Sequence, residues 1–370
     1  MRTGVANLPL HYGKAPRWLF EKMVPLAREI SRAIVYEYDS EELLVRLSDP
    51  FWFQSFGCVL GFDWHSSGLT TTTLGALKEA LKGQENELGI YVCGGKGKTS
   101  RKTPREIEGY CEKGAFSKPS ILTSSSRLSA KVDNNALQDG FTLYHHNFIF
   151  TSSGSWAVVQ QGMSDYYARR YHWRFQSKTQ NTLRLRSGQA KHKKEKEFSF
   201  VREPHAGIAS QKLGVRTLNL VAGESENTRQ TVTELSKEKP EKILNYLKKI
   251  NELTLSEHHY VKVNPESIRK ILLSTYERQA QDFQALLGME GVGAKTLRAL
   301  TLISDLIFGT RTSVKDPAKF SFAHGGKDGH PYPVDREGYQ KSIDILQKAI
   351  NKAKIGKSDR IEALRRLAFN

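Results

Sequence analysis

The sequence has little of several features that would assign it to a familiar class of protein. Its 370 residues include only three cysteines, Cys58, Cys93 and Cys111, and no Cys-x-x-Cys pair. Such cysteine usage predicts neither a disulfide framework nor a zinc ribbon, and a reduced, cytoplasmic protein is expected. No run of eighteen apolar residues occurs, so no transmembrane helix is predicted. The first residues also lack the basic-then-apolar order of a signal peptide.

Acidic residues are scarce relative to basic ones. Fifty-six lysines and arginines stand against thirty-nine aspartates and glutamates, which gives a formal net charge of +17. This excess suits a polyanionic partner, because lysine and arginine release counterions from phosphates. Hydrophobic residues at 38% and aromatic residues at 10% are still enough for a packed core. DNA is therefore the expected partner and a membrane is not, whereas protein partners are not indicated.

The pattern along the chain predicts an α+β protein in which a mixed N-terminal domain precedes a mostly helical C-terminal domain. Phe141–Phe150 and Trp156–Gln160 surround a polar glycine turn, which predicts a β-hairpin in the first domain. Residues 177–197 hold seven basic and two acidic residues and are predicted to be a mobile basic loop or an insertion. The predicted divisions are a mixed α/β domain over 1–220, a helical connector over 221–264 and a helical DNA-binding domain over 265–370.

The strongest local pattern is Gly291-Val-Gly-Ala-Lys-Thr296. A helix from Tyr276 to Gly288 is expected to precede it, and a second helix, with Leu306 and Ile307 on its buried side, is expected to follow. The two glycines allow a sharp turn and a close approach to another molecule, and the free N–H groups at the second helix's start suit a phosphate. The residues expected to contact DNA are Gly291, Val292, Gly293, Lys295, Thr296 and Arg298.

Two interpretations of this pattern remain open. One is a DNA grip, in which valine at Gly291 or Gly293 would weaken binding and leave the fold intact. The other is an ordinary helical hairpin with a glycine turn.

The pattern resembles the helix-hairpin-helix element of DNA glycosylases, and Pro333-Val-Asp335 resembles the element that follows it in that family. The resemblance implies that Lys295 attacks the sugar C1′ to form a Schiff base and that Asp335 is the catalytic aspartate. A flipped nucleotide would leave C1′ accessible to such an attack. The function implied is that of a DNA-repair glycosylase or abasic-site lyase. The alternative makes Lys295 a phosphate contact and Asp335 a helix N-cap.

Polar residues that suit acid–base or metal chemistry are concentrated on apolar segments of the first domain. A buried carboxylate or imidazole must be hydrogen-bonded, paired or metal-bound. Three aspartates with a histidine would suit a divalent metal, so a metal-dependent DNA nuclease is the second hypothesis, and a non-enzymatic DNA-binding scaffold is the third. No cofactor is predicted with certainty. The candidate pocket comprises Asp63, His65, Asp133, Asp139, His145, His146, Gln160, Gln161, Arg170, His172, Glu203 and His205.

A basic segment, Gly94-Gly-Lys-Gly-Lys-Thr99, lies between the first predicted strand and the rest of the domain. Its spacing differs from that of a phosphate-binding P-loop. It is expected instead to be a flexible basic loop that touches the backbone of nucleic acid.

Longer blocks of sequence resemble one family from end to end of the chain. They are Arg2–His11, Asp63–Ser67, Val158–Met163, Ala168–Trp173, Glu203–Ile208 and His324–Asp335. On these blocks the chain is similar to the uncharacterised prokaryotic domain-of-unknown-function family 763, and residues 177–197 do not look like one of its blocks. The resemblance implies no activity, so the function must be argued from individual residues.

Overall fold

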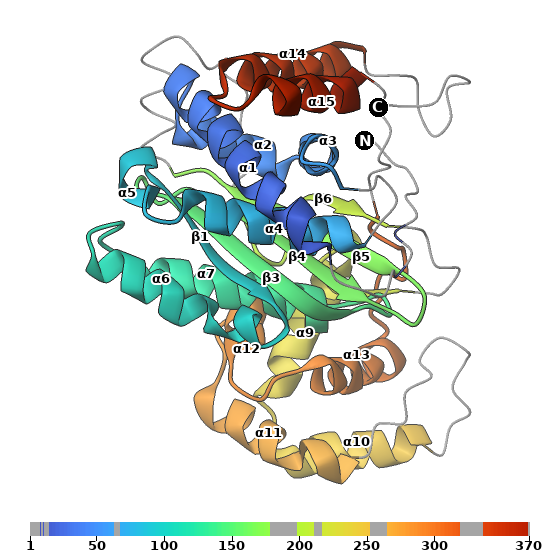
Figure 1. Cartoon of the computed structure of the whole chain (residues 1–370). Coiled ribbons are helices and arrows are strands. Elements are labelled where there is room, and N and C mark those ends of the chain that lie inside the picture. The colour runs from blue at the N-terminus through green and yellow to red at the C-terminus, as the bar shows by residue number, and fades with distance from the viewer. Residues whose placement is uncertain are drawn as a thin grey trace.

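The structure, a computed structural model, describes residues 8, 10, 15–62, 67–177, 198–210, 217–251, 265–318 and 336–368 (Figure 1). In chain order its α-helices are α1 (Arg17–Glu37), α2 (Ser40–Ser48), α3 (Pro50–Val59), α4 (Gly68–Leu81), α5 (Glu85–Leu88), α6 (Thr103–Glu112), α7 (Pro119–Lys131), α9 (Glu226–Ser236), α10 (Pro240–Asn251), α11 (Pro265–Arg278), α12 (Phe283–Gly288), α13 (Ala294–Phe308), α14 (Arg336–Lys352) and α15 (Lys357–Ala368). The strands are β1 (Ile90–Lys96), β2 (Leu137–Gln138), β3 (Thr142–Thr151), β4 (Trp156–Met163), β5 (Ala168–Phe175), β6 (His205–Ala209) and β7 (Leu218–Asn219). The short helical turns are η1 (Gly97–Lys102), η2 (Val132–Ala136) and η3 (Gly223–Ser225).

A five-stranded antiparallel sheet forms the centre of the molecule, in the order β1-β3-β4-β5-β6. The predicted hairpin is confirmed as β3 and β4, with Phe150 opposite Trp156 across the turn. The separate pair β2 and β7 is also antiparallel. Helices together with an antiparallel sheet confirm the α+β class.

Helices cover both faces of the sheet, because side chains of alternate strand residues point to opposite faces and both sets are apolar. Phe148, Trp156 and Trp173 are buried on one face, in the core that includes α9, α12 and α13. Ile149 and Val159 are buried on the other face, in the core that includes α1–α4. Figure 1 shows the blue and red helices above the sheet and the yellow and orange helices below it.

In the helical layer above the sheet, helices from the two ends of the described chain pack on one another. α14 packs on α1, and α15 packs on α3. α1, α2 and α4 lie within the predicted mixed N-terminal domain, and α1 runs through Pro25. α3 was not predicted as a helix, because its residues are apolar on every side and show no helical period. The Asp49 carboxylate begins it by accepting from the N–H groups of Phe51 and Trp52.

In the helical layer below the sheet, two expectations about the helices around the glycine-rich pattern are wrong. The helix expected to run from Tyr276 to Gly288 is two helices. α11 ends at Arg278, Gln279 takes a left-handed φ of 48°, and Asp282 begins α12 by accepting from the Ala285 N–H at 2.7 Å. At the end of α13, Leu306 and Ile307 are 49% and 42% exposed instead of buried, because the last turn of this helix projects beyond the core.

The predicted domain boundaries remain predictions. A single apolar core joins the lower face of the sheet to the helices of the predicted connector and of the predicted DNA-binding domain. The basic segment is outside the described part of the chain from residue 178 to residue 197. Within the described ranges, no helix combines the length and the apolar character needed to cross a membrane.

We predict that Glu41 is a stability determinant, because it fixes α2 to the β3–β4 turn. Its buried carboxylate accepts from Thr151 Oγ1 at 2.5 Å and from Ser153 Oγ at 2.6 Å. Glu41→Ala leaves both hydroxyls without this acceptor and should lower the free energy of unfolding by about 1–3 kcal/mol in urea titrations. The matched control is Glu42→Ala, one residue on, where only a partly exposed pair with Arg46 is removed and the change should stay below about 1 kcal/mol. Equal losses in the two variants would contradict the prediction.

Candidate functional site

A short segment that runs from the end of α7 toward β3, residues 131–139, carries polar side chains that reach both the sheet and the helices below it. It leaves α7 through η2, a π-helical turn, and ends in β2. Turns of this kind occur often at functional sites, because the widened backbone redirects side chains. Asp133 and Asp139 point from this segment toward the sheet, whereas Lys131 and Gln138 reach the helices below.

Asp133 is fully buried and is the centre of a first cluster. Its Oδ2 accepts from Trp173 Nε1 at 2.8 Å and from Gln160 Nε2, and its Oδ1 accepts from His205 Nε2 at 2.5 Å. His146 joins the cluster through Gln160, whose Oε1 lies 2.6 Å from His146 Nδ1. Four residues of the predicted pocket are thus brought together from η2, β3, β4 and β6.

The hydrogen-bond partners fix the tautomers of both imidazoles. Because a side-chain carbonyl oxygen only accepts, His146 Nδ1 donates to Gln160, and its Nε2 accepts from Ser126 Oγ at 2.9 Å. Burial lowers the pKa of His146, which agrees with this neutral form. In the neutral ring of His205, Nε2 donates to Asp133 and Nδ1 carries the lone pair. His205 is therefore arranged as a proton acceptor oriented by a buried carboxylate.

Asp139 belongs to a second cluster and does not contact Asp133. Its Oδ2 accepts from Arg169 Nη1 and from Tyr171 Oη, each at 2.8 Å, and its Oδ1 accepts from the Phe141 N–H. Arg169 also donates to Asp316 Oδ2 at 2.8 Å and to Ser210 Oγ at 2.8 Å. Removing one partner of such a buried pair typically costs about 3–5 kcal/mol, so this cluster serves the fold.

Two further predicted residues lie on the opposite face of the sheet. Arg170 donates to Gln54 Oε1 at 2.9 Å, and Gln161 donates to the Ser67 carbonyl at 2.9 Å and to Tyr144 Oη. The guanidinium of Arg170 also lies 4.7 Å from the centre of the Phe53 ring. Gln161 and Arg170 therefore attach α3 and α4 to the sheet and do not share a pocket with Asp133.

Of the other predicted pocket residues, Glu203 lies beside His205 and the rest are dispersed. His145 and His172 are buried on β3 and β5. Glu203 is exposed just before β6 and has a left-handed φ of 48°. Asp63 and His65 lie outside the described residues. The predicted single pocket thus divides into clusters on two faces, because consecutive strand residues point in opposite directions.

His205 lines a cleft of about 280 Å³ between β6, β7 and the segment that follows α13. We call this space the His205 cleft. Its floor is apolar and its rim is mainly acidic. It is lined by Glu203, His205, Ile208, Asn219, Val221, Ala222, Gly223, Glu224, Ser313, Lys315, Asp316 and Pro317.

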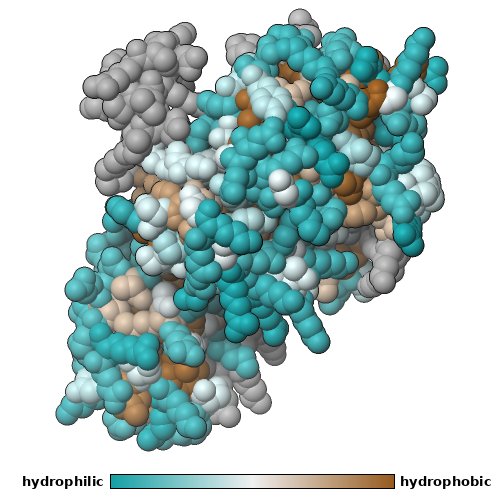
Figure 2. Space-filling view, turned by 60° about the vertical axis from the view of Figure 1, so that its left-hand side comes forward, coloured by the Kyte–Doolittle hydropathy of each residue, from teal (hydrophilic) through white to brown (hydrophobic). Residues whose placement is uncertain are grey.

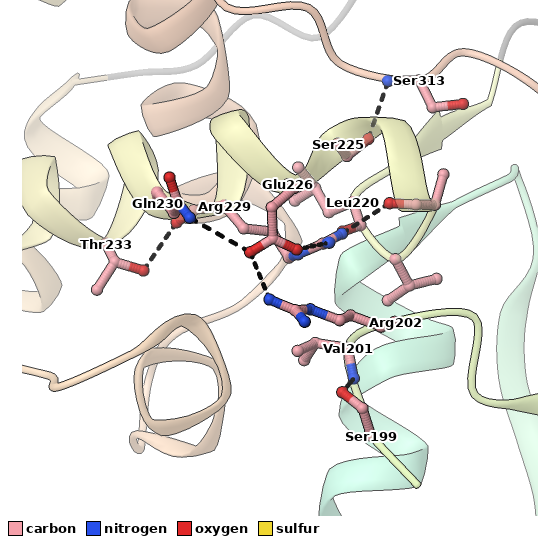
Figure 3. Close-up of polar contacts among 12 residues, drawn as sticks. Ser199, Val201, Arg202, Leu220, Ser225, Glu226, Arg229, Gln230, Thr233 and Ser313 are labelled. Carbon is pink, nitrogen blue, oxygen red and sulfur yellow. Dashed lines mark hydrogen bonds and ion pairs between the residues drawn. The ribbon is translucent and has the colours of Figure 1, made fainter. Parts of the chain in front are cut away.

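A second cleft, of about 370 Å³, lies between α9 and the start of α12. Figure 3 shows the Glu226 carboxylate between two guanidinium groups, with Arg202 Nη2 at 2.8 Å and Arg229 Nη2 at 2.6 Å. Arg229 also donates to the Leu220 carbonyl at 2.6 Å and to that of Ala222 at 2.8 Å. Both guanidinium groups are paired with the one carboxylate, and the arrangement anchors the chain between β7 and α9.

The glycine-rich turn between α12 and α13 is held by the segment 131–139. Lys131 Nζ donates to the carbonyls of Leu287, at 2.8 Å, and Met289. Gln138 donates to the Ala294 carbonyl at 2.9 Å and accepts from Arg298 Nε at 2.6 Å. The turn is thus attached to the main core at its start and at its end.

The residues predicted to contact DNA differ in accessibility. Val292 and Thr296 are buried, and Arg298 is half-buried against Gln138. Lys295 is exposed in the first turn of α13, which Gly293 begins without a side-chain cap. Asp335 lies outside the described residues. Within the described part of the turn, Lys295 is the predicted contact whose charged group reaches solvent.

The expectation that a valine leaves the fold intact does not hold for one of the two glycines. Gly291 has a left-handed φ of 82°, and a Cβ there would lie 2.5 Å from Ile271 Cδ1. Gly291→Val would therefore disturb the fold. Gly293 has a φ of −131°, and a Cβ there would meet only the Gly291 carbonyl, at 3.9 Å. Gly293 thus has the space that Gly291 lacks.

A group of exposed cations follows β1 on η1 and the first turn of α6. We call it the η1 basic surface. Its members are Lys96, Lys98, Arg101, Lys102 and Arg105. None of the five makes an ion pair with another residue that the structure describes, and the nearby Glu106 is paired with Lys78 at 2.7 Å. The expected basic loop is thus partly a 3₁₀ helix rather than a flexible loop.

Sequence reasoning missed several members of the clusters. Ser126, on α7, and Asp316, far along the chain, carry no sequence signal, because only the fold brings them to His146 and Arg169. Arg169, Tyr171 and Trp173 did carry a signal, since polar groups alternate with bulky ones on an otherwise apolar strand. Among the residues that can be described, no group of three or more histidines, cysteines and acids could hold a metal ion.

Comparison with known proteins identifies one family. The family model described as "Protein of unknown function (DUF763)" matches residues 4–196 and 179–334, so the two matches overlap over most of the basic segment. Neither the curated proteins nor the solved structures contain a match.

The buried histidines predict that the protein loses stability in mild acid. Burial lowers the pKa of His145 to about 3 and that of His172 well below its usual value of about 6.5. The unfolded chain therefore binds more protons than the folded chain below pH 6.5. The part of the free energy of unfolding that depends on these neutral histidines is fully present above that pH. It should fall as the pH decreases toward 3, by up to about 1.4 kcal/mol per pH unit for each such histidine.

Urea titrations between pH 7 and pH 5 test this expectation. In His145→Leu the free energy of unfolding should depend less steeply on pH than in the natural sequence, whatever its value at pH 7. Identical slopes for the two proteins would show that His145 does not titrate on unfolding.

Proposed function

Since the chain belongs to the DUF763 family, whose description gives no function, its activity must be argued from its residues, and we propose that it binds the phosphate backbone of nucleic acid, DNA in the first instance. The observation that carries this proposal is the η1 basic surface, with five exposed cations within ten residues and no ion pair among described residues. Cations left unpaired at a surface keep their full charge for an external polyanion.

The α12–α13 turn supports the same function from a second position. η1 contacts β3, β3 contacts η2, and η2 contacts α13, so the two basic elements are connected through adjoining structure. Exposed Arg127 on α7 adds a cation one turn before Lys131, which holds α12. At the start of α13 the first N–H groups and Lys295 together suit one phosphate. This supports binding along the backbone without recognition of sequence.

The character of the surface favours a polyanion over an apolar partner. Figure 2 shows a mainly hydrophilic face, on which hydrophobic residues form separate spots. Other exposed cations are already paired with carboxylates four residues away in the chain, such as Arg17 with Glu21 and Lys242 with Glu238. The net charge of +17 adds a long-range attraction that would speed association.

The resemblance to helix-hairpin-helix glycosylases supports the finer proposal of glycosylase or lyase chemistry. That proposal requires Lys295 to be partly neutral near a carboxylate, and an exposed amine in the first turn of α13 fits a phosphate contact better. We therefore propose Lys295 as a grip on the backbone, and the lyase hypothesis remains a prediction for a direct chemical test.

The first test removes three cations of the η1 basic surface, in the variant Lys98→Gln/Arg101→Gln/Lys102→Gln. Duplex DNA affinity should fall, and the slope of log affinity against log salt should become shallower by roughly 0.9 for each phosphate that is no longer neutralised. Gel shifts at four salt concentrations measure both quantities. The matched control, Arg17→Gln/Lys82→Gln/Lys242→Gln, removes the same charge from residues that are paired with carboxylates three or four residues away. If the control weakens binding as much, net charge and not this surface is responsible.

The second test concerns Lys295→Gln. A backbone grip predicts lower affinity, a shallower salt slope, and no borohydride-trapped adduct of the natural protein on an abasic-site duplex. A trapped adduct that disappears in Lys295→Gln would instead assign the Schiff base to this amine and establish the lyase hypothesis.

A further inference from the structure

We propose that the His205 cleft binds an amino-bearing heterocycle of the kind that nucleic acid bases present. The choice of a nucleobase rests on the proposed function, whereas the preference for a ligand rich in N–H donors rests on the cleft alone. The cleft lies between β6, β7 and the segment after α13 and has a volume of about 280 Å³.

His205 is the residue that points to a ligand. Its side chain is 5% exposed, and its Nε2 is committed to Asp133 at 2.5 Å. Asp133 also accepts from Trp173 and Gln160, so the imidazole is held in one orientation and one tautomer. The lone pair on Nδ1 lies on the side of the ring away from Asp133. Among the described residues nothing donates to Nδ1, so an acceptor at the cleft is left for a ligand that donates.

The rim of the cleft supplies further acceptors. Glu203, Glu224 and Asp316 carry carboxylates, of which Glu224 is paired with Lys315 at 2.9 Å and Asp316 with Arg169 at 2.8 Å. A carboxylate can accept several hydrogen bonds, so these pairs leave lone pairs for a ligand. Carboxylates disfavour a phosphate and favour amino groups, from which they accept hydrogen bonds. The cleft therefore selects for donors, in contrast to the η1 basic surface.

The floor of the cleft suits a flat, apolar ring. Ile208 and Val221 are buried beneath it, and Pro317 closes one side. A planar heterocycle can lie on such a floor while its exocyclic amino group reaches the acceptors at the rim. The left-handed backbone of Glu203, two residues before His205, is a strained conformation of the type found at ligand sites.

The cleft is connected to the proposed nucleic-acid surface through one segment. Residues 131–139 hold His205 through Asp133 and hold the start of α13 through Gln138. A base taken out of a nucleic acid strand is recognised by hydrogen bonds to its edge within such a pocket. Adenine, cytosine and guanine carry such an amino group, and adenine and cytosine are the candidates to test first because each has a natural counterpart in which a carbonyl oxygen replaces it.

Calorimetric titration of the full chain with matched nucleosides tests the proposal. Adenosine should bind at least about tenfold more tightly than inosine, and cytidine than uridine, because the second member of each pair replaces the amino group with a carbonyl oxygen that the carboxylates repel. Inorganic phosphate should not compete. Equal affinities within each pair, or competition by phosphate, would overturn the proposal.

Two variants locate the binding. His205→Phe keeps a ring and removes the acceptor, and Glu224→Gln removes a charge from the rim; each should weaken adenosine binding about tenfold. Gln230→Ala, in the cleft of Figure 3, is the control and should bind adenosine as the natural protein does. If His205→Phe does not fold, Glu224→Gln decides, and undiminished binding in the folded variants would refute the site.

Gel shifts of the same variants separate this proposal from the proposed function. His205→Phe and Glu224→Gln should keep the DNA affinity of the natural protein, since neither residue belongs to the η1 basic surface. If the protein binds DNA but binds no nucleoside, the proposal for the His205 cleft is wrong and the proposed function stands. Nucleoside binding without DNA binding overturns the proposed function and leaves the cleft standing.

Discussion

The burial of the Asp133 carboxylate is the constraint on which much of the interior depends. An ionised carboxylate away from water is stable only when donors surround it, and here Trp173, Gln160 and His205 provide them from three strands. Each donor must keep its position for the buried carboxylate to remain hydrogen-bonded. The central strands and η2 are therefore fixed relative to one another by hydrogen bonds that a purely apolar interface would not specify. The orientation of His205 at the edge of its cleft is a direct result.

The segment 131–139 extends this constraint to the helical layer below the sheet. Lys131 binds the carbonyls at the end of α12, and Gln138 binds the start of α13. Asp139 meanwhile pairs with Arg169, which reaches Asp316 beyond α13. Nine consecutive residues thus connect a sheet, a glycine-rich turn and a cleft. A ligand at either end of the segment would act on the same short stretch of backbone.

The charged groups of the protein are divided between two kinds of surface. The η1 basic surface carries cations without counter-ions among described residues, whereas the rim of the His205 cleft carries three carboxylates. Elsewhere exposed cations are paired with nearby carboxylates, as Arg17 is with Glu21. On the η1 basic surface unneutralised charge costs stability through self-repulsion, which a polyanion would relieve. In the cleft Glu224 is paired with Lys315 and Asp316 with Arg169, and the remaining lone pairs of these carboxylates can accept hydrogen bonds. This division suggests that the η1 basic surface binds phosphate and that the His205 cleft binds a ring rich in N–H donors.

The sequence by itself determined the elements whose signals are local. The β3–β4 hairpin followed from a glycine turn between β-prone runs, and the sharp turn before α13 followed from its two glycines. α9 and α10 lie within the predicted helical connector. Only the tertiary structure decided which polar residues meet. His145 and His146 are neighbours in sequence yet point to opposite faces, whereas Ser126, Asp133 and His205 are far apart and join one hydrogen-bonded chain through His146 and Gln160. Period and turn chemistry act over a few residues, but the register of a sheet and the packing of helices on it set which distant side chains share a site.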